Sequence, residues 1–137
     1  MTQVEIPKDF LKVYYNSSAY PGNASGFLEG ANCQHFCYEI LRHNGFQIGD
    51  LRSSNLWEDC DFTKKVDKPK PFDILLFNSN KKSWGAHVGL FLGEGRIIHL
   101  AKKIGIPVIW TESKFYEQPE YKTLVGIKRP TIKTMAN

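Results

Sequence analysis

The second half of the chain consists of short apolar runs that turn-forming residues separate. Five runs are present, each bounded by Gly, Asn, Lys or Pro: 73–77, 87–92, 96–100, 107–110 and 123–128. Runs of this length with such boundaries predict β-strands rather than helices. The sequence Gly93-Glu94-Gly95 between the second and third runs predicts a tight hairpin.

The first half follows a helical period instead. Asn32 is a favourable N-cap, and apolar residues recur after it at helical spacing until His43, with Gly45 as the stop signal. The apolar face of this predicted helix consists of Cys33, Phe36, Cys37, Ile40 and Leu41. The thiol of Cys33 is therefore expected on the buried side of the first helical turn.

Two shorter helical segments are also predicted in the first half. Residues 8–15 show amphipathic spacing directly after Pro7. Ser53 or Ser54 can cap a short helix that runs through Trp57. Both segments are short, so we expect them to cover the core rather than to form it.

This order of elements predicts the fold class. Helices followed by a set of short strands favour an α+β domain with an antiparallel sheet, and turn-rich loops are predicted over 16–30 and 59–71. The chain has 137 residues, of which 42% are hydrophobic and 23% charged, a composition typical of one globular domain. We expect a single domain over 1–137, with N-terminal helices and the Cys33 helix packed on a central sheet of about five strands.

Cys33 and two downstream histidines are the clearest candidates for catalytic residues. The first turn of a helix carries unpaired backbone N–H groups, which lower the pKa of a cysteine thiol. A thiolate nucleophile also needs an imidazole as base and a third group that fixes the tautomer of that imidazole. His87 and His99 lie on neighbouring predicted strands. A hairpin can place the two rings side by side on one face of the sheet, so that one orients the other.

An ordered set of segments resembles the NlpC/P60 hydrolases, a family with a Cys-His-polar triad on a minimal papain-like fold. The segments similar to the family's nucleophile, base and orienting motifs are 32–36 (NCQHF), 85–93 (GAHVGLFLG) and 97–99 (IIH). The segments similar to its first strand, to the stretch after the nucleophile helix and to its last strand are 71–77, 51–54 and 125–129. The resemblance covers about residues 18–130 and preserves the order of the motifs.

The resemblance implies a role for each site residue. Cys33 would be the nucleophile, His87 its base and His99 the residue that orients the base. Tyr20, which precedes Pro21, matches the family tyrosine whose hydroxyl helps to form the oxyanion hole. The implied reaction is cleavage of an amide bond through a thioester, in a peptide or a cell-wall muropeptide, without a cofactor or a metal ion.

Two residues after the nucleophile motivate alternative functions. Gln34 and His35 stand where the family usually has small residues, and NCQHF is close to the NCEHF motif of the lecithin retinol acyltransferase family. One alternative is therefore an acyltransferase or lipid-amide hydrolase of that type, and another is a non-catalytic binding module on the same fold. In the acyltransferase family the histidine precedes the cysteine, whereas His87 and His99 follow Cys33, which favours the hydrolase.

The remaining titratable residues have structural interpretations. Cys37 and Cys60 have no motif around them and are expected to be inert thiols. His35 and His43 are expected to be exposed helix residues. Cys33, His35 and Cys37 do not form a zinc site, because positions two apart face different directions on a helix. Two further side chains have expected positions: Asp73 should hold a turn before a strand, and Trp84 should line a substrate groove.

Charge and terminal sequence bear on partners and location. The 18 basic and 14 acidic residues give a net charge of +4, and the basic residues are scattered, so no nucleic-acid interface is predicted. The opening residues lack the basic and apolar regions of a secretory signal, and no apolar run is long enough to span a membrane. We expect a cytoplasmic protein, or one exported by a route that the sequence does not show. The oligomeric state is left open.

Overall fold

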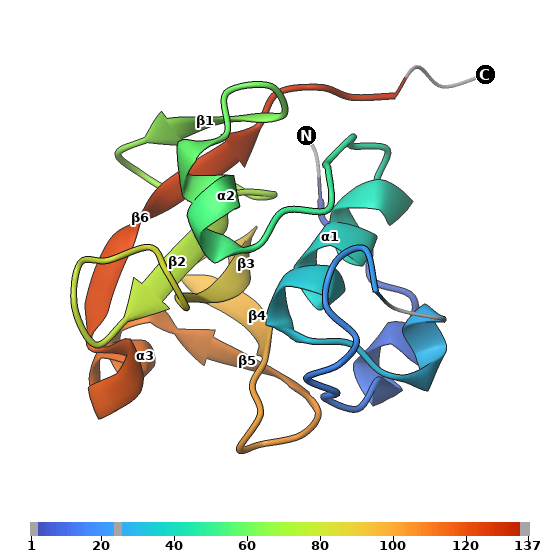
Figure 1. The fold of residues 1–137 in the computed structure, drawn as a ribbon, viewed down its shortest axis with the longest axis horizontal. Coiled ribbons are helices and arrows are strands. Elements are labelled where there is room, and N and C mark those ends of the chain that lie inside the picture. Colours follow the sequence, from blue (N-terminus) through green and yellow to red (C-terminus); the bar gives the residue numbers. More distant parts are fainter. Residues whose placement is uncertain (1–2, 24–25, 135–137) are drawn as a thin grey trace.

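The computed structural model describes residues 3–23 and 26–134. Its helical elements are the 3-10 helices η1 (Lys8–Lys12), η2 (Phe27–Glu29) and η3 (Pro119–Tyr121) and the α-helices α1 (Cys33–His43), α2 (Ser53–Glu58) and α3 (Glu112–Tyr116). Its strands are β1 (Thr63–Val66), β2 (Ile74–Asn78), β3 (His87–Gly93), β4 (Arg96–Leu100), β5 (Pro107–Thr111) and β6 (Thr123–Pro130). Figure 1 shows the helices grouped around one sheet, which confirms the α+β prediction.

Within the described ranges the strands form one antiparallel sheet of six strands, in the order β1-β6-β2-β3-β4-β5. The five predicted strands correspond to β2 to β6, and their ends agree to within two residues. The prediction missed β1, which falls inside the loop expected over 59–71. Its residues Lys64 and Lys65 are exposed, and lysines are common on edge strands because they discourage pairing with another chain.

The two faces of the sheet contact different helices. Alternate residues of the central strands point to opposite faces, since the side-chain period of a strand is two. The face that meets α1 carries Ile74, Leu76, Val88, Leu90 and Ile98. The opposite face carries Leu75, Phe77, Phe91 and Ile97 and packs against Phe115 of α3. The sequence did not predict α3, whose five residues are too few to show a helical period.

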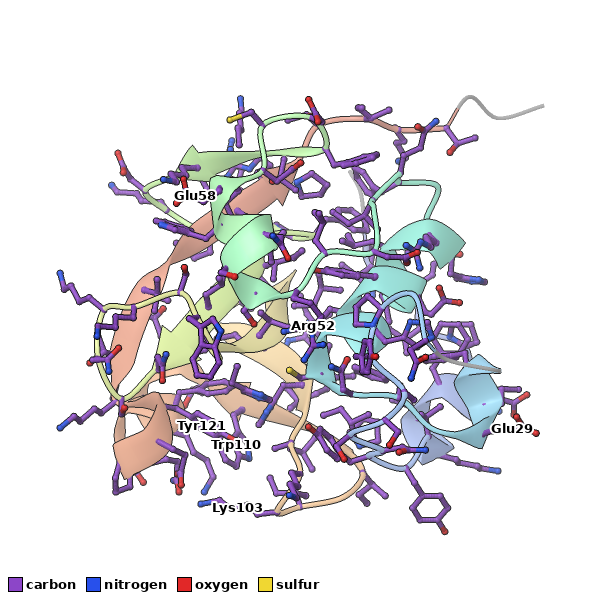
Figure 2. All side chains as sticks on the ribbon, viewed as in Figure 1. Glu29, Arg52, Glu58, Lys103, Trp110 and Tyr121 are labelled. Carbon is purple, nitrogen blue, oxygen red and sulfur yellow. The ribbon has the colours of Figure 1, made fainter. Side chains whose placement is uncertain are left out.

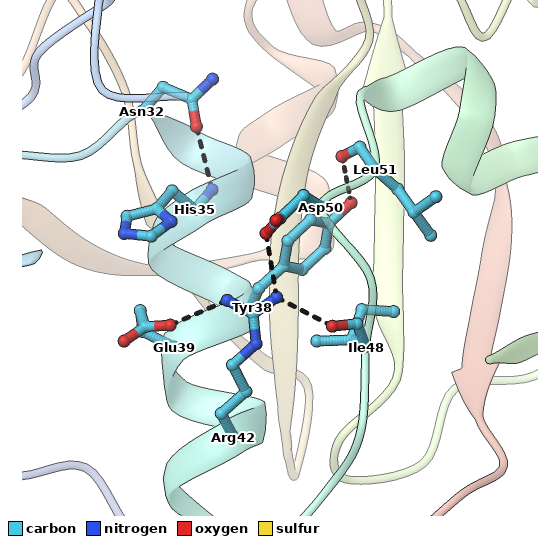
Figure 3. Close-up of polar contacts among 8 residues, drawn as sticks. All are labelled: Asn32, His35, Tyr38, Glu39, Arg42, Ile48, Asp50 and Leu51. Carbon is cyan, nitrogen blue, oxygen red and sulfur yellow. Dashed lines mark hydrogen bonds and ion pairs between the residues drawn. The ribbon is translucent and has the colours of Figure 1, made fainter. Parts of the chain in front are cut away.

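Polar contacts hold α1 in place at both of its ends (Figure 3). The Asn32 side chain accepts a hydrogen bond from the His35 N–H at 2.9 Å, so the predicted N-cap is confirmed. The Tyr38 hydroxyl donates to the Leu51 carbonyl at 2.7 Å. Near the C-terminus, the Arg42 guanidinium contacts three groups: Glu39, the Ile48 carbonyl and Asp50. The N-cap bond fixes the first turn, on which the Cys33 thiol lies, and the bonds of Tyr38 and Arg42 tie the rest of α1 to residues 48–51.

The shorter helical predictions needed correction. Over 8–15 the chain forms only the 3-10 helix η1, and the loop predicted over 16–30 contains η2, with residues 24–25 outside the described part. Neither Ser53 nor Ser54 caps α2. Arg52 occupies the cap position, and the Ser53 hydroxyl donates instead to the Ala86 carbonyl. Serine hydroxyls bond readily to backbone groups, and here the packing brings the Ala86 carbonyl, not the helix N-terminus, within reach of Ser53.

Asp73 ties the start of β2 to β6. Its carboxylate accepts a hydrogen bond from the Lys70 N–H at 2.8 Å, which confirms that it holds the turn before the strand. It also accepts bonds from both Nε and Nη2 of Arg129 at 2.8–3.2 Å. The Asp73 side chain is 1% exposed and that of Arg129 25%. A bidentate ion pair of this kind is strong because both partners are charged and aligned.

We predict that Asp73→Asn lowers the free energy of unfolding by about 3 kcal/mol, because the substitution leaves the Arg129 charge partly buried without its partner. Urea denaturation at neutral pH measures this change. Asp67→Asn is the matched control, since Asp67 is exposed, and it should change stability by less than about 0.5 kcal/mol. Equal losses in the two variants would contradict a stabilising role for the ion pair.

Candidate active site

His87 and His99 share a hydrogen bond across the β3–β4 hairpin. Nε2 of His87 lies 2.8 Å from Nδ1 of His99, so the predicted side-by-side placement is confirmed. Gly89 leaves room for this arrangement. A Cβ atom at Gly89 would lie 2.6 Å from the Ile97 side chain and 3.4 Å from the Cβ of His99.

Aromatic side chains enclose the far side of this histidine pair. The His99 ring lies 4.4 Å from Trp110, 4.5 Å from Phe115 and 6.5 Å from Tyr121, measured between ring centroids. We call these three residues the aromatic box. Tyr121 also stacks on His87, with centroids 4.5 Å apart and planes at 20°; Figure 2 labels Tyr121 and Trp110 next to one another. Nε2 of His99 is buried here and has no hydrogen-bond partner among the described residues.

Burial keeps both imidazoles neutral. It lowers the pKa of His99 to about 3. Burial is the larger cause, and the neighbouring His99 the smaller one, that hold the pKa of His87 well below its ordinary value. Two neutral imidazoles share one hydrogen bond, so one ring nitrogen donates and the other accepts.

The Cys33 thiol lies at the start of α1, 8% exposed. It lines a cleft of about 330 Å³ together with His87, and we call this space the thiol cleft. Backbone N–H groups of Val88 and Gln34 donate toward the sulfur, and the Arg52 charge also favours the thiolate. Burial nevertheless outweighs these effects and raises the pKa of the Cys33 thiol. The expectation of a lowered pKa from the helix N-terminus alone was therefore wrong.

Gln34 links three parts of the site. Its side-chain amide donates to the Ser53 hydroxyl at 2.5 Å, and this hydroxyl donates to the Ala86 carbonyl at 2.5 Å. The helices α1 and α2 and the residue before His87 are thereby connected. The prediction for His35 was wrong: it is 9% exposed, because η2 places Phe27 against its ring at a centroid distance of 5.5 Å. Sequence periodicity could not reveal this cover, which comes from outside α1.

Two tyrosines line the thiol cleft, Tyr15 and Tyr121, and neither is the one that the sequence indicated. Tyr20 is half-buried, and the Arg52 guanidinium lies 4.4 Å above its ring. Arg52 lines the cleft, whereas Tyr20 is not among its described lining residues. Tyr15 does line the cleft. Burial, and to a smaller extent the neighbouring Cys33, raises the pKa of its hydroxyl. No motif in the sequence marked Tyr15.

A second pocket extends the thiol cleft. Its volume is about 500 Å³, and it shares Gln34, Arg52 and Gly85 with the cleft. Trp84 forms one wall of this pocket, with 80% of its surface exposed, and its contact with a substrate stays a prediction. We call this space the Trp84 pocket. Figure 2 shows Arg52 between α1 and α2, where the two spaces meet.

Three further observations concern the described part of the chain as a whole. It contains no group of three or more His, Cys, Asp or Glu residues arranged to hold a metal ion. Cys33, Cys37 and Cys60 are unpaired thiols there. None of its helices has both the length and the apolar character needed to cross a membrane.

Known proteins are similar to this chain in sequence and in fold. The NlpC/P60 family model matches residues 17–129. The gamma-D-glutamyl-L-lysine dipeptidyl-peptidase of Bacillus subtilis (strain 168) is 31% identical over 115 residues, which cover 79% of this chain and 34% of that protein. The crystal structure of an NlpC/P60 family protein from Bacillus cereus ATCC 10987 aligns with a TM-score of 0.60 at 19% identity, over 92% of this chain and 41% of that one. The chain thus spans well under half the length of either protein.

We predict that the neutral histidine pair makes stability fall as pH drops below about 6.5, the ordinary pKa of histidine. The unfolded chain takes up protons there, whereas folded His99 takes none until its pKa of about 3. The free energy of unfolding should therefore fall by up to about 1.4 kcal/mol per pH unit for each buried histidine. Urea denaturation at pH 7, 6 and 5 measures this slope.

His99→Gln removes one of the three histidines, His35, His87 and His99, whose pKa burial lowers, and should make the slope shallower. His43→Gln removes an exposed histidine and serves as the matched control, with the slope of the parent protein. Parallel slopes for His99→Gln and the parent protein would contradict the assignment of His99 as a histidine that stays neutral in the folded state.

Proposed function

The chain belongs to the NlpC/P60 family, and on that basis we propose that it is a cysteine hydrolase that cleaves an amide bond in cell-wall peptides. One observation carries the proposal. The thiol at the start of α1 and the imidazole at the start of β3 line the same cleft, and a second imidazole is bonded to the first at 2.8 Å. A nucleophile, a base and an orienting group are the parts that thiol catalysis requires.

The name of the B. subtilis relative supports the substrate class. That protein is a gamma-D-glutamyl-L-lysine dipeptidyl-peptidase. We extend this to the chain described here: its substrate is a peptide in which the γ-carboxyl of D-glutamate is joined to the amine of a diamino acid. A net charge of +4 suits an acidic peptide of this kind.

The tautomers of the histidine pair follow from the role of His87. If His87 takes the thiol proton on Nδ1, that nitrogen must be free, so its proton lies on Nε2 and is donated to Nδ1 of His99. His99 then carries its own proton on Nε2, the atom that lacks a hydrogen-bond partner in the described structure. That N–H faces the aromatic box, where a weak N–H···π contact is available. The opposite tautomers would leave His87 with no free nitrogen for the thiol.

The proposed reaction begins from a neutral thiol and a neutral imidazole, because burial disfavours both charged forms. As the sulfur of Cys33 attacks the amide carbonyl carbon, its proton moves to Nδ1 of His87. The resulting imidazolium gives this proton to the leaving amine, and a thioester remains. Water then attacks the thioester with His87 as base, which releases the acid and restores the thiol.

A hydroxyl donor completes the proposed site. By resemblance, Tyr20 and the backbone N–H of Cys33 stabilise the oxyanion that forms during attack. Tyr20 does not line the thiol cleft, but its ring contacts Arg52, which does. Tyr15 lines the cleft directly and is the second candidate for the hydroxyl.

We predict that Cys33→Ala lowers kcat/KM for a γ-D-glutamyl-L-lysine peptide by at least about 10³-fold, because the nucleophile is removed. The rate is measured as the amount of free lysine released over time, which is quantified by chromatography. Cys60→Ala is the matched control: it removes an exposed thiol and should leave the rate unchanged.

Three other outcomes would count against this proposal. Full activity of Cys33→Ala would overturn the thiol mechanism. Transfer of a fatty acyl group to an acceptor by the parent protein, without lysine release, would favour the acyltransferase alternative. Peptide binding without turnover would favour a binding module.

A further inference from the structure

The imidazole of His87 is oriented by a neutral group and not by a carboxylate. In a triad whose third member is an aspartate, the carboxylate stabilises the imidazolium that forms during attack. Here the third group is His99, which stays neutral because burial lowers its pKa to about 3. Among the lining residues of the thiol cleft that the structure describes, Glu120 alone is acidic, and it pairs with Lys103 at 3.1 Å. A proton on His87 therefore has to be stabilised by something other than an adjacent anion.

The Tyr121 ring presents its face to the same imidazole. The two ring centroids lie 4.5 Å apart and the planes meet at 20°, so His87 lies over the face of the ring and not at its edge. The face of an aromatic ring carries partial negative charge, and a cation within about 6 Å of the centroid is attracted to it. Phe115 is farther from His87, at 6.3 Å and 38°. Tyr121 is thus the ring best placed to interact with a charge on His87.

Neighbouring residues hold Tyr121 in this position. It ends η3, and its N–H donates to the Gln118 carbonyl at 3.0 Å. Its ring lies 6.0 Å from Phe115 and 6.4 Å from Trp110, next to which Figure 2 labels it. Burial is the largest cause that raises the pKa of its hydroxyl to about 12, so the hydroxyl keeps its proton at neutral pH. Tyr121 therefore meets His87 as a neutral, positioned ring.

We propose that Tyr121 is a positioning residue that speeds acylation of Cys33 by stabilising the imidazolium form of His87 through a cation–π contact. This inference rests on the proposed function. The neutral imidazole gains little from the negative face, whereas the imidazolium that forms as the thiol attacks gains the full attraction. An interaction that is stronger in the transition state than in the ground state lowers the barrier. In a site shielded from water, a cation–π contact corresponds to about a threefold to thirtyfold increase in rate.

The first test compares three variants by their kcat/KM for the γ-D-glutamyl-L-lysine peptide. Tyr121→Phe keeps the aromatic face and should retain the rate of the parent protein. Tyr121→Leu keeps an apolar side chain without the face and should be slower by about threefold to thirtyfold. Tyr116→Leu is the matched control, because Tyr116 is a tyrosine of α3 that packs against Phe77 and lies outside the thiol cleft. It should retain the rate of the parent protein.

A second series separates the charge of the ring from its packing. Position 121 is replaced by phenylalanines that carry one, two or three fluorine atoms, which draw electrons from the ring face and change its shape little. The value of kcat/KM should fall with each added fluorine, from that of Tyr121→Phe toward that of Tyr121→Leu. Urea denaturation of the same proteins is the control, and the free energy of unfolding should not follow the number of fluorine atoms.

Two outcomes would overturn the role of Tyr121 while the proposed function stands. Equal rates across the fluorinated series would do so even with a slow Tyr121→Leu, because a packing role does not depend on the charge of the ring face. A loss in Tyr121→Phe as large as in Tyr121→Leu would assign the effect to the hydroxyl instead. Failure of the parent protein to release lysine would overturn the proposed function and this inference with it.

Discussion

The contact between the first turn of α1 and the start of β3 is the constraint on which the site depends. The Val88 N–H donates toward the sulfur of Cys33 there, and the Gln34–Ser53–Ala86 hydrogen bonds hold the same two elements together. The apolar face of α1 packs on β3 and β4, and this packing sets the distance between helix and strand. A thiol and an imidazole that are 54 positions apart in the sequence meet because this contact forms.

Burial gives the site its electrostatic character. The aromatic box and the sheet exclude water from His99, which keeps that ring neutral and able only to share a proton with His87. The same exclusion of water raises the pKa of the Cys33 thiol. The activation that we propose is therefore a proton transfer between two neutral groups and not a pre-formed ion pair. On its exposed side the thiol cleft carries the charges of Arg52, Lys102 and Glu120.

The sequence predicted those parts of the molecule in which local patterns and tertiary packing agree. The five central strands, the helix from Cys33 to His43 with its Asn32 cap, and the adjacent histidines all follow from periodicity and turn residues. The strand β1 was missed because its residues are those of a charged edge. The burial of His35 and the place of Tyr15 were missed because both depend on segments folded over α1 from elsewhere in the chain.

The most direct test of the central claim, that Cys33 is acylated during turnover, is acid-quench mass spectrometry with an aryl ester of the γ-D-glutamyl group. The phenol leaves readily, so acylation outpaces hydrolysis and the thioester accumulates. We expect a mass increase equal to the acyl group, located on Cys33 by fragmentation and removed by hydroxylamine. Turnover of the ester with no adduct on Cys33, or with the adduct on Cys37 or Cys60, would contradict it.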